Sequence, residues 1–443
     1  MRIEYGSKII KTLRVKILDK PGYLGRLALT VGELGGMFGE IKTVHIGKDY
    51  KVRDLDVYFS TKEDVDRICE TISSLDGIEL VEIRDIVQEV HQNGKIEVVP
   101  RVQIESVDDL RLVYTPGVAS ICKLIQESPE LARKYTTIPN NVAIVTNGTA
   151  ILGLGDIGPV AGMPVMEGKA LLFKMLSGIN GYPILIDSKD PRVIIDTVKA
   201  IAPTFGAIKL EDIKAPECFE IEETLDKELD IPVTHDDQHG TAVVVLAALL
   251  NIAKYTFINL RDSTLGIIGL GAAGSGIQKL LTAYGIKKIY GTDLNPQMKD
   301  LFAARGGIPT DLKGIMDNAK IVIATTGCPK LITPDMVKKG QIILALSNPD
   351  PEIDPEDAMK AGALYAADGK AINNALAFPG LFKGALMANA KTINARMKIA
   401  AAQAIANHTL YGDLVPNILN VKVHEEVAKA VEEEAYKSGV AKV

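Results

Sequence analysis

Tryptophan is absent from this 443-residue sequence, and aromatic residues make up only 5% of it, so the core must be built mainly from aliphatic side chains. The four cysteines are far apart and form no CxxC pair, which excludes a disulfide framework and is typical of a reducing compartment. No apolar run reaches the roughly 18 residues of a membrane span. Residues 1–15 lack the apolar segment of a signal peptide. We therefore expect a cytoplasmic protein without a membrane partner.

Strong charge of either sign is also missing. The formal net charge is only -6, and the basic residues are dispersed along the chain. This gives no electrostatic reason to expect nucleic acid or an anionic membrane surface as a partner, so small polar ligands are favoured. The composition, 47% hydrophobic and 24% charged, is that of a soluble globular protein with room for two or three domains.

Residues 12–84 show alternating apolar positions interrupted by two segments of helical spacing, which predicts a βαββαβ order. That order is typical of a ferredoxin-like domain, a four-stranded antiparallel sheet with two helices on one face. The turn DKPGYLGR, residues 19–26, resembles the ACT family of small regulatory domains. The resemblance implies a small-molecule effector, such as an amino acid, at an edge-to-edge pairing interface. A purely structural or dimerising module is the alternative.

Two pairs of carboxylates follow predicted buried strands. Glu211 and Asp212 follow the strand 205–210, and Asp236 and Asp237 follow another strand in the segment VTHDDQHGTA. Ligands of open α/β sheets bind beyond the carboxyl ends of the strands, so these side chains are expected to converge if the strands are neighbours. Carboxylates packed so closely repel each other, and a divalent cation with oxygen ligands would compensate them. Either pair alone could instead be a solvated loop or a helix cap.

Two further side chains are candidates for proton transfer. We expect a helix to begin near Met166, with Lys169 in its first turn, where the helix dipole disfavours a cation and lowers the pKa of the amine. Tyr114 precedes a Pro-Gly turn, a position where a tyrosine usually serves packing.

A dinucleotide-binding pattern follows in the second half of the chain. A strand, a GxGxxG motif, a helix and a second strand ending at Asp293 form the Rossmann signature. The glycines admit a pyrophosphate to the helix N-terminus, and Asp293 can accept hydrogen bonds from ribose hydroxyls. Because the carboxylate would repel a 2′-phosphate, the sequence favours NAD over NADP. The motif residues expected to contact the cofactor are Gly269, Gly271, Ala272, Ala273 and Gly274.

A series of motifs across residues 105–415 resembles the malic enzymes, in particular their short bacterial and archaeal branch. The motifs are YTPGV, TNGTAILGLGDIG followed by GK, LEDI, HDDQHGTA, LALSNP and NNALAFPG. The resemblance implies oxidative decarboxylation of L-malate to pyruvate and CO2, with NAD or NADP and with Mg²⁺ or Mn²⁺. One departure stands out. Many family members carry an arginine just before ILGLGD, where this sequence has Thr149 and Ala150. Lys174 is a candidate substitute, although a solvated lysine on the helix surface is the favoured interpretation.

The resemblance also implies roles for individual residues. It makes Lys169 the general base, Tyr114 the general acid that protonates the enol, and Asp236 a partner that helps set the protonation of the lysine. The implied metal ligands are Glu211, Asp212 and Asp237, and the implied substrate-binding amides are Asn348, Asn373 and Asn374, with Asn348 also near the cofactor. His235 and His239 could suggest zinc, but their place in the motif favours packing or supporting roles.

The predicted fold class is therefore α/β, a Rossmann-type doubly wound parallel sheet plus an α/β substrate domain, preceded by the ferredoxin-like domain. We expect boundaries at 1–88, 89–240 for substrate and metal, 241–415 for NAD and 416–443 for a helical tail, with one long helix over 378–406. A homodimer or larger homo-oligomer is expected. The alternatives are a malolactic-type decarboxylase, which retains the cofactor and releases lactate, and a ligand-sensing protein with a degenerate enzyme half.

Overall fold

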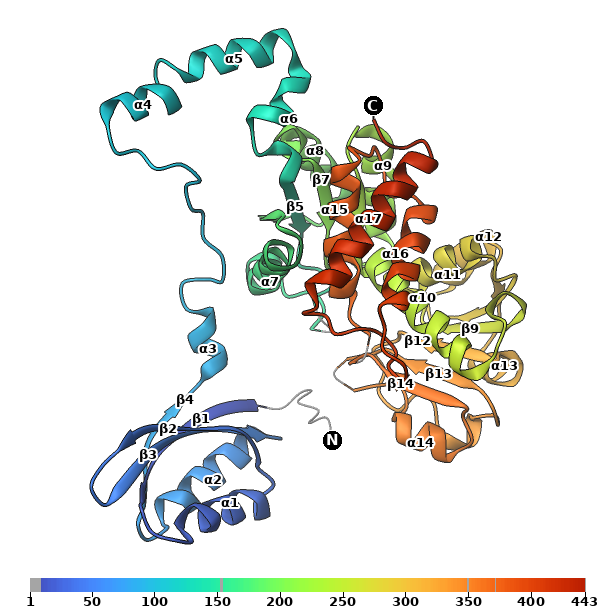
Figure 1. The fold of residues 1–443 in the computed structure, drawn as a ribbon. Helices are drawn as coiled ribbons and strands as arrows, with labels where there is room; N and C mark the ends of the chain where they lie inside the picture. Colours follow the sequence, from blue (N-terminus) through green and yellow to red (C-terminus); the bar gives the residue numbers. More distant parts are fainter. Residues whose placement is uncertain (1–8, 152–153, 349, 371, 443) are drawn as a thin grey trace. The chain divides into compact units, whose positions relative to one another are not determined.

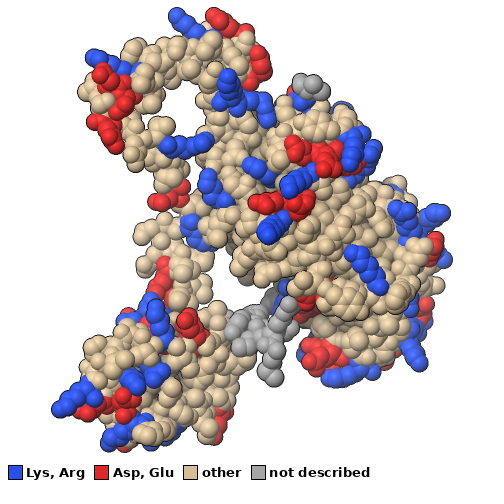
Figure 2. All heavy atoms as spheres, viewed as in Figure 1, with Lys and Arg blue, Asp and Glu red and all other residues tan. Residues whose placement is uncertain are grey.

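The structure, a computed structural model, describes residues 9–151, 154–348, 350–370 and 372–442. The chain divides into two units, Met1–Lys95 and Ile96–Val443, and each is described by itself (Figure 1). On the face shown in Figure 2, basic and acidic side chains are intermingled, in keeping with the small net charge.

The first unit has the predicted βαββαβ order. Its antiparallel sheet has the strand order β2-β3-β1-β4. Alternate residues of the strands, such as Leu13, Val15 and Val57, are buried in one core with Leu27 and Ile68 of the two helices. The elements are β1 (Ile9–Leu18), α1 (Tyr23–Glu33), β2 (Met37–Ile46), β3 (Tyr50–Phe59), α2 (Lys62–Ser73) and β4 (Ile78–Arg84), followed by the short α3 (Ile86–His91).

A parallel four-stranded sheet with the order β6-β5-β7-β8 forms the first half of the second unit. Helices α7, α8 and α9 connect its strands, and the central β5 and β7 are buried along their whole length, as expected for a parallel sheet covered by helices. The elements are β5 (Asn141–Thr146), α7 (Pro159–Ser177), β6 (Asn180–Leu185), α8 (Pro191–Ile201), β7 (Ala207–Leu210), α9 (Glu217–Glu228) and β8 (Val233–His235). Leu210 is paired with His235, so the residues that follow β7 and β8 emerge side by side.

The second half carries a parallel six-stranded sheet with the order β11-β10-β9-β12-β13-β14. The chain leaves β9 toward one side and later returns to its other side at β12, which creates a switch point beyond the end of β9. The predicted α/β Rossmann-type architecture is therefore present. Its elements are β9 (Thr264–Ile268), α11 (Ala272–Tyr284), β10 (Lys288–Thr292), α12 (Pro296–Ala304), β11 (Ile308–Pro309), α13 (Leu312–Asn318), β12 (Ile321–Ala324), β13 (Ile342–Ala345), α14 (Pro355–Lys360) and β14 (Tyr365–Asp368).

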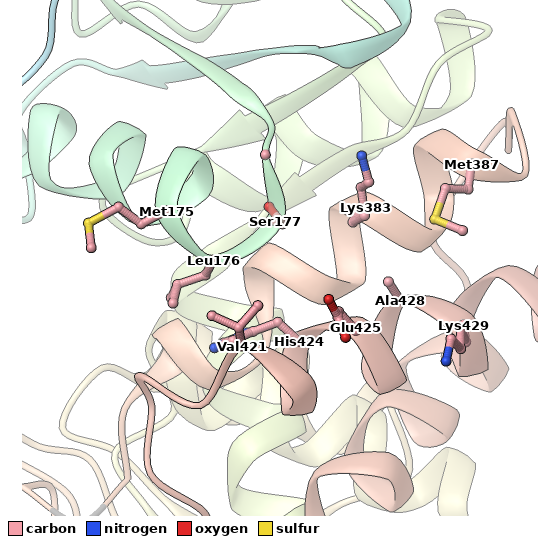
Figure 3. A pocket seen from close by; sticks show the side chains of 11 residues that line it. Met175, Leu176, Ser177, Lys383, Met387, Val421, His424, Glu425, Ala428 and Lys429 are labelled. Carbon is pink, nitrogen blue, oxygen red and sulfur yellow. The ribbon is translucent and has the colours of Figure 1, made fainter.

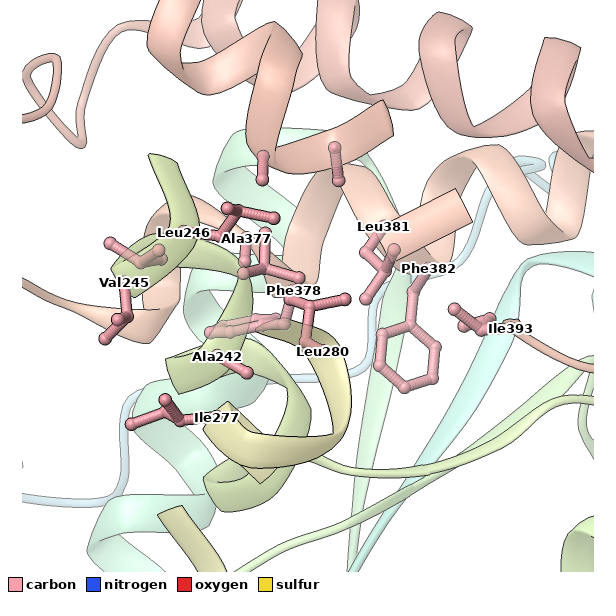
Figure 4. Close-up of a cluster of buried hydrophobic side chains, with 14 of the residues drawn as sticks. Ala242, Val245, Leu246, Ile277, Leu280, Ala377, Phe378, Leu381, Phe382 and Ile393 are labelled. Carbon is pink, nitrogen blue, oxygen red and sulfur yellow. The ribbon is translucent and has the colours of Figure 1, made fainter. Parts of the chain in front are cut away.

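Helix α10 (Asp236–Thr256) joins the two halves and is buried along most of its length. Its side chains Ala242 and Leu246 share one hydrophobic core with Ile277 of α11 and Phe378 (Figure 4). By length and composition α10 could cross a membrane, but 67% of its apolar window is buried within the protein, as in the core helix of a soluble protein.

The expectation of one long helix over residues 378–406 is wrong. The segment forms α15 (Phe378–Met387) and α16 (Ala395–Asn407), separated by a turn. Asn389 takes a left-handed φ of 48°, and the side chain of Asn394 accepts a hydrogen bond from the Met397 amide, which caps α16. The C-terminal helix α17 (Val421–Lys437) packs against both and buries one apolar face, including Val427.

Candidate active site

Three carboxylates converge at the carboxyl ends of β7 and β8. Glu211 and Asp212 follow β7 directly, and Asp237 is the second residue of α10. One ligand oxygen from each lies within 4.8 Å of the other two. Two oxygens bound to one Mg²⁺ at about 2.1 Å are at most about 4.2 Å apart, so shifts below about 1 Å would place all three on one ion.

The backbone of Asp212 holds this cluster in shape. Its φ is +52°, in the left-handed region, and its amide donates a 3.0 Å hydrogen bond to Asp237 Oδ2. Its carbonyl accepts a hydrogen bond from the Ala150 amide. The buried Oδ2 of Asp212 has no hydrogen-bond partner among the described residues. A buried carboxylate oxygen without a partner is unfavourable, so this donor set fits a hard divalent cation.

The pKa values of two carboxylates in the cluster shift in opposite directions. Burial, reinforced by the charge of Asp237, raises the pKa of Asp212. Burial would also raise the pKa of Asp237, but the imidazole of His235, 3.2 Å from Asp237 Oδ2, outweighs it and lowers that pKa. His235 therefore stabilises the ionised form of Asp237.

Lys169 lies at the same point. Its Nζ is 3.0 Å from Asp236 Oδ2, 3.0 Å from Glu211 Oε1 and 3.2 Å from Asn374 Oδ1. The prediction that Lys169 lies in the first turn of a helix is wrong, because α7 begins at Pro159 and not near Met166. At a rise of about 1.5 Å per residue, Lys169 lies about 15 Å along the helix, beyond the reach of the N-terminal dipole.

Sequence reasoning missed a second lysine, Lys209. It lies within β7, is 0% exposed, and its Nζ contacts Glu211 Oε2 and lies 3.0 Å from Asp236 Oδ2. Burial lowers the pKa of Lys209, and Asp236 opposes that effect. The only available signal was a charged residue inside a strand predicted to be buried. Such a lysine almost always needs a carboxylate partner.

The predicted substrate-binding amides are only partly assembled. Asn374 accepts a hydrogen bond from Lys169 and so lies beside the cluster. The side chain of Asn373 instead accepts a hydrogen bond from the Ala375 amide and caps its own turn. Asn348 is exposed in the loop after β13. Lys174 lies near the end of α7 and donates to Asn180 Oδ1 at 2.9 Å, so it is engaged away from the carboxylates.

The positions where family members often carry arginine have structural roles here. Thr149 is buried, and its hydroxyl donates to Asn147 Oδ1 and accepts a hydrogen bond from the Lys214 amide. The Ala150 amide donates to the Asp212 carbonyl. These residues therefore brace the loop that carries Asp212.

Tyr114 is not brought to the cluster. It follows α4 (Val107–Val113) and precedes α5 (Val118–Glu127), and its side chain is 66% exposed. Within these two described helices no residue is buried. In Figure 1 both helices extend away from the sheet of β5 to β8.

A buried network supports the cluster from behind. Glu222 accepts hydrogen bonds from the His235 amide and from Gln238, and His239 Nε2 lies 2.8 Å from it. Burial opposes the charge of Glu222, but the contact with His239 outweighs burial and holds the pKa of the carboxyl well below its usual range. Burial lowers the pKa of His239 to about 4. Among the described residues, the group able to hold a metal includes neither histidine.

The glycine motif opens onto a cavity of about 590 Å³ lined by Gly269, Gly271 and Asp293, with Lys299 and Cys328 on its wall. A Cβ added at Gly271 would meet no described atom within 4 Å, so the backbone there is open to a ligand. Asp293 accepts hydrogen bonds from the amides of Leu270 and Asn295. This cavity at the N-terminus of α11 fits a dinucleotide.

A second cavity, of about 390 Å³, lies between the end of α7, α15 and α17 (Figure 3). Met175, Lys383, Met387 and His424 are among its lining residues. None of the residues that the sequence marked as functional lines it.

Comparisons with known proteins agree with this geometry. Residues 93–226 match the family model described as malic enzyme, N-terminal domain. The NAD-dependent malic enzyme 1 of Bacillus subtilis is 51% identical over 429 residues, which cover 96% of this chain and 98% of that protein. The bifunctional malic/malolactic enzyme of the same organism is 42% identical, covering 79% of this chain and 92% of that protein. The crystal structure of malic enzyme from Pyrococcus horikoshii superimposes with a TM-score of 0.77 at 44% identity, covering 81% of this chain and 92% of that chain.

Proposed function

Because this chain belongs to the malic enzyme family, we propose that it oxidises L-malate with NAD and decarboxylates the product to pyruvate and CO2. The observation that carries the proposal is the convergence of Glu211, Asp212 and Asp237 beside Lys169. The cavity at the glycine motif supplies a place for the dinucleotide in the same unit.

Oxidation of a secondary alcohol needs a base for the hydroxyl proton. Lys169 in its neutral form fits this role, because Asp236 and Asn374 fix its amine at the edge of the carboxylate cluster. Glu211, Asp212 and Asp237 would hold Mg²⁺ or Mn²⁺, which when bound stabilises negative charge on the substrate oxygen during decarboxylation. Gly271 and Asp293 line the cavity that would hold NAD, which when bound would supply the hydride acceptor.

The direct test is to supply L-malate, NAD and Mn²⁺ and to follow NADH and CO2 together. Equal amounts of both support the proposal. A malolactic reaction is the second candidate, because one relative at 42% identity is named a bifunctional malic/malolactic enzyme. CO2 and lactate without net NADH would establish that reaction instead. Absence of malate-dependent CO2 would favour a sensing protein with a degenerate enzyme half.

We also propose that the protein acts as a homodimer in which Tyr114 serves the site of the partner. The segment around Tyr114 exposes apolar side chains that a soluble protein would normally cover. They include Val98, Val102, Val107, Leu110 and Leu112, which are between 42% and 91% exposed. A second copy would cover this surface by a self-complementary contact and bring the hydroxyl of Tyr114 to a carboxylate cluster, where the enol must be protonated.

Mixed subunits test this arrangement. Tyr114→Phe and Lys169→Ala each remove a different group, so each variant alone should be nearly inactive. If the two groups come from different subunits, a dimer with one variant chain of each kind has one intact site. After unfolding and refolding an equal mixture, about one quarter of the wild-type activity should return. No recovery in a mixture that forms mixed dimers would place both groups in one subunit.

The first unit is proposed to be an ACT-type regulatory domain, and the protein to be cytoplasmic. The edge strand β2 leaves Ile41, Val44 and Ile46 exposed, which suits pairing with another strand. Titration of the full-length protein with the common amino acids, followed by malate turnover and thermal unfolding, tests for an effector. An unchanged response to every one of them would leave a structural or dimerising role.

A further inference from the structure

Two lysines share two carboxylates at the heart of the site. Glu211 Oε1 lies 3.0 Å from Lys169, and Glu211 Oε2 contacts Lys209. Asp236 Oδ2 lies 3.0 Å from both ammonium groups. Both Nζ atoms also lie over the ring of Phe378, at 5.1 and 4.7 Å from its centre. Each oxygen of Glu211, an implied metal ligand, is therefore already in contact with a cation.

The two lysines differ in what they can reach. The side chain of Lys169 is 12% exposed and borders the space where substrate would bind, but the side chain of Lys209 is 0% exposed. Lys209 projects from an interior strand of the sheet, with β5 on one side and β8 on the other. In the structure its Nζ is enclosed and contacts Glu211 and Asp236. Any role of Lys209 in the reaction must therefore act through Glu211 and Asp236.

We propose that Lys209 is a positioning residue that competes with the metal, restricting Glu211 to one available oxygen and weakening cation binding. The inference rests on the proposed metal site at Glu211, Asp212 and Asp237. A cation that takes Oε1 displaces only the partly buried Lys169, while Lys209 keeps its contact with Oε2. Glu211 then binds through a single oxygen, and the amine of Lys209 stays next to the ion.

Electrostatics gives the direction of the effect. Four carboxylates, Glu211, Asp212, Asp236 and Asp237, face two lysines, so loss of Lys209 leaves more uncompensated negative charge around the ion. At the partial screening inside a protein, one charge a few ångströms from a dication changes its affinity by on the order of tenfold or more. The same loss increases repulsion among the carboxylates when no ion is bound, so the metal-free protein should be less stable.

The test measures binding of Mn²⁺ alone, without substrate or cofactor, from the electron paramagnetic resonance signal of the free ion at pH 7. Lys209→Met, which keeps an unbranched side chain and removes the amine, should lower the Kd for Mn²⁺ by about tenfold or more. Lys209→Gln removes the charge and keeps an N–H donor, and it should change the Kd in the same direction. Both variants should unfold at a lower temperature than wild type without Mn²⁺ and recover most of the difference with saturating Mn²⁺.

Lys398→Met is the matched control. Lys398 is also a lysine whose pKa is lowered by burial, but the carboxylates that influence it are Glu222 and Asp226, outside the metal cluster. This variant should lose stability and keep the wild-type Kd for Mn²⁺.

Two outcomes overturn the inference. A Lys209→Met protein that is less stable but binds Mn²⁺ with unchanged or weaker affinity would show that Lys209 serves the fold alone. If Asp237→Asn leaves wild-type Mn²⁺ binding intact, the proposed metal site is wrong and the inference falls with it. The first result leaves the proposed function standing, so the two failures are distinguishable.

Discussion

Two glycines of one motif should respond in opposite ways to the same added methyl group. At Gly274 the new Cβ would lie 1.9 Å from the carbonyl oxygen of Gly269, a backbone atom that cannot move aside without distorting the loop. Overpacking of this kind destabilises a protein by about 1–3 kcal/mol. At Gly271, with φ of -63°, the Cβ meets no described atom within 4 Å, so the change in stability should stay within about 0.5 kcal/mol.

Cofactor binding should show the opposite order, with the direct effect at Gly271. The Cβ of Gly271→Ala points into the cavity where the pyrophosphate would approach the backbone, so NADH affinity should fall by at least about tenfold, or about 1.4 kcal/mol. Gly274→Ala should lower the unfolding temperature first, by several degrees at about 2–4 °C per kcal/mol. Gly32→Ala in α1, where a Cβ also meets nothing within 4 Å, controls for the added methyl.

The assay is a fluorescence titration with NADH beside a calorimetric unfolding scan of each variant. Wild-type NADH affinity in a folded Gly271→Ala protein would place the pyrophosphate elsewhere. A wild-type unfolding temperature in Gly274→Ala would show that the loop yields more easily than its geometry implies. Either result refutes the reasoning from the cavity.

Three further predictions concern the proposed chemistry and its support. Lys169→Ala should lower kcat for NADH formation by about 10²–10⁴-fold while the protein still binds Mn²⁺. Asp293→Ser should raise the use of NADP relative to NAD, because Lys299 lines the same cavity, and adding Lys299→Ala should cancel that gain in kcat/KM. The pKa of His239 is lowered by burial to about 4, so the unfolded chain takes up its proton first as pH falls. Denaturant unfolding should show about 3 kcal/mol of stability lost between pH 6.5 and 4, and His239→Asn should remove that part of the loss.

Much of the scaffold follows from local pattern. Several strands of the two parallel sheets, such as β9, β12 and β13, are short apolar runs. The periodicity of the first unit predicts its βαββαβ order. The meeting of Glu211 with Asp236 and Asp237 could be anticipated because strand ends of a parallel sheet share one edge. The pairing of Leu210 with His235 brings the ends of β7 and β8, and so these carboxylates, side by side.

Errors arose where the chain overrides its local signals. Helix α7 begins at Pro159, before the expected start near Met166, and it continues through Pro164, a residue that normally marks a helix boundary. The alanine-rich segment after Phe378 has strong helical propensity throughout, yet α15 ends at Met387. A left-handed Asn389 and the cap at Asn394 divide the segment there. Propensity averaged over such a window conceals the interruption at residues 388–394.

The site itself depends on information that no single segment carries. The burial of Lys209 is explained only by the folded structure, in which α7 and α10 bring Lys169 and Asp236 close to Glu211. A lysine within a buried strand is improbable without such partners, so its presence in a sequence is a prompt to look for carboxylates on neighbouring strands. Applied to the strand of Lys209, that rule points to Glu211 and to the Asp pair after the next strand. The carboxylate cluster and Lys209 therefore depend on each other, because the opposite charge of each offsets the cost of burying the other.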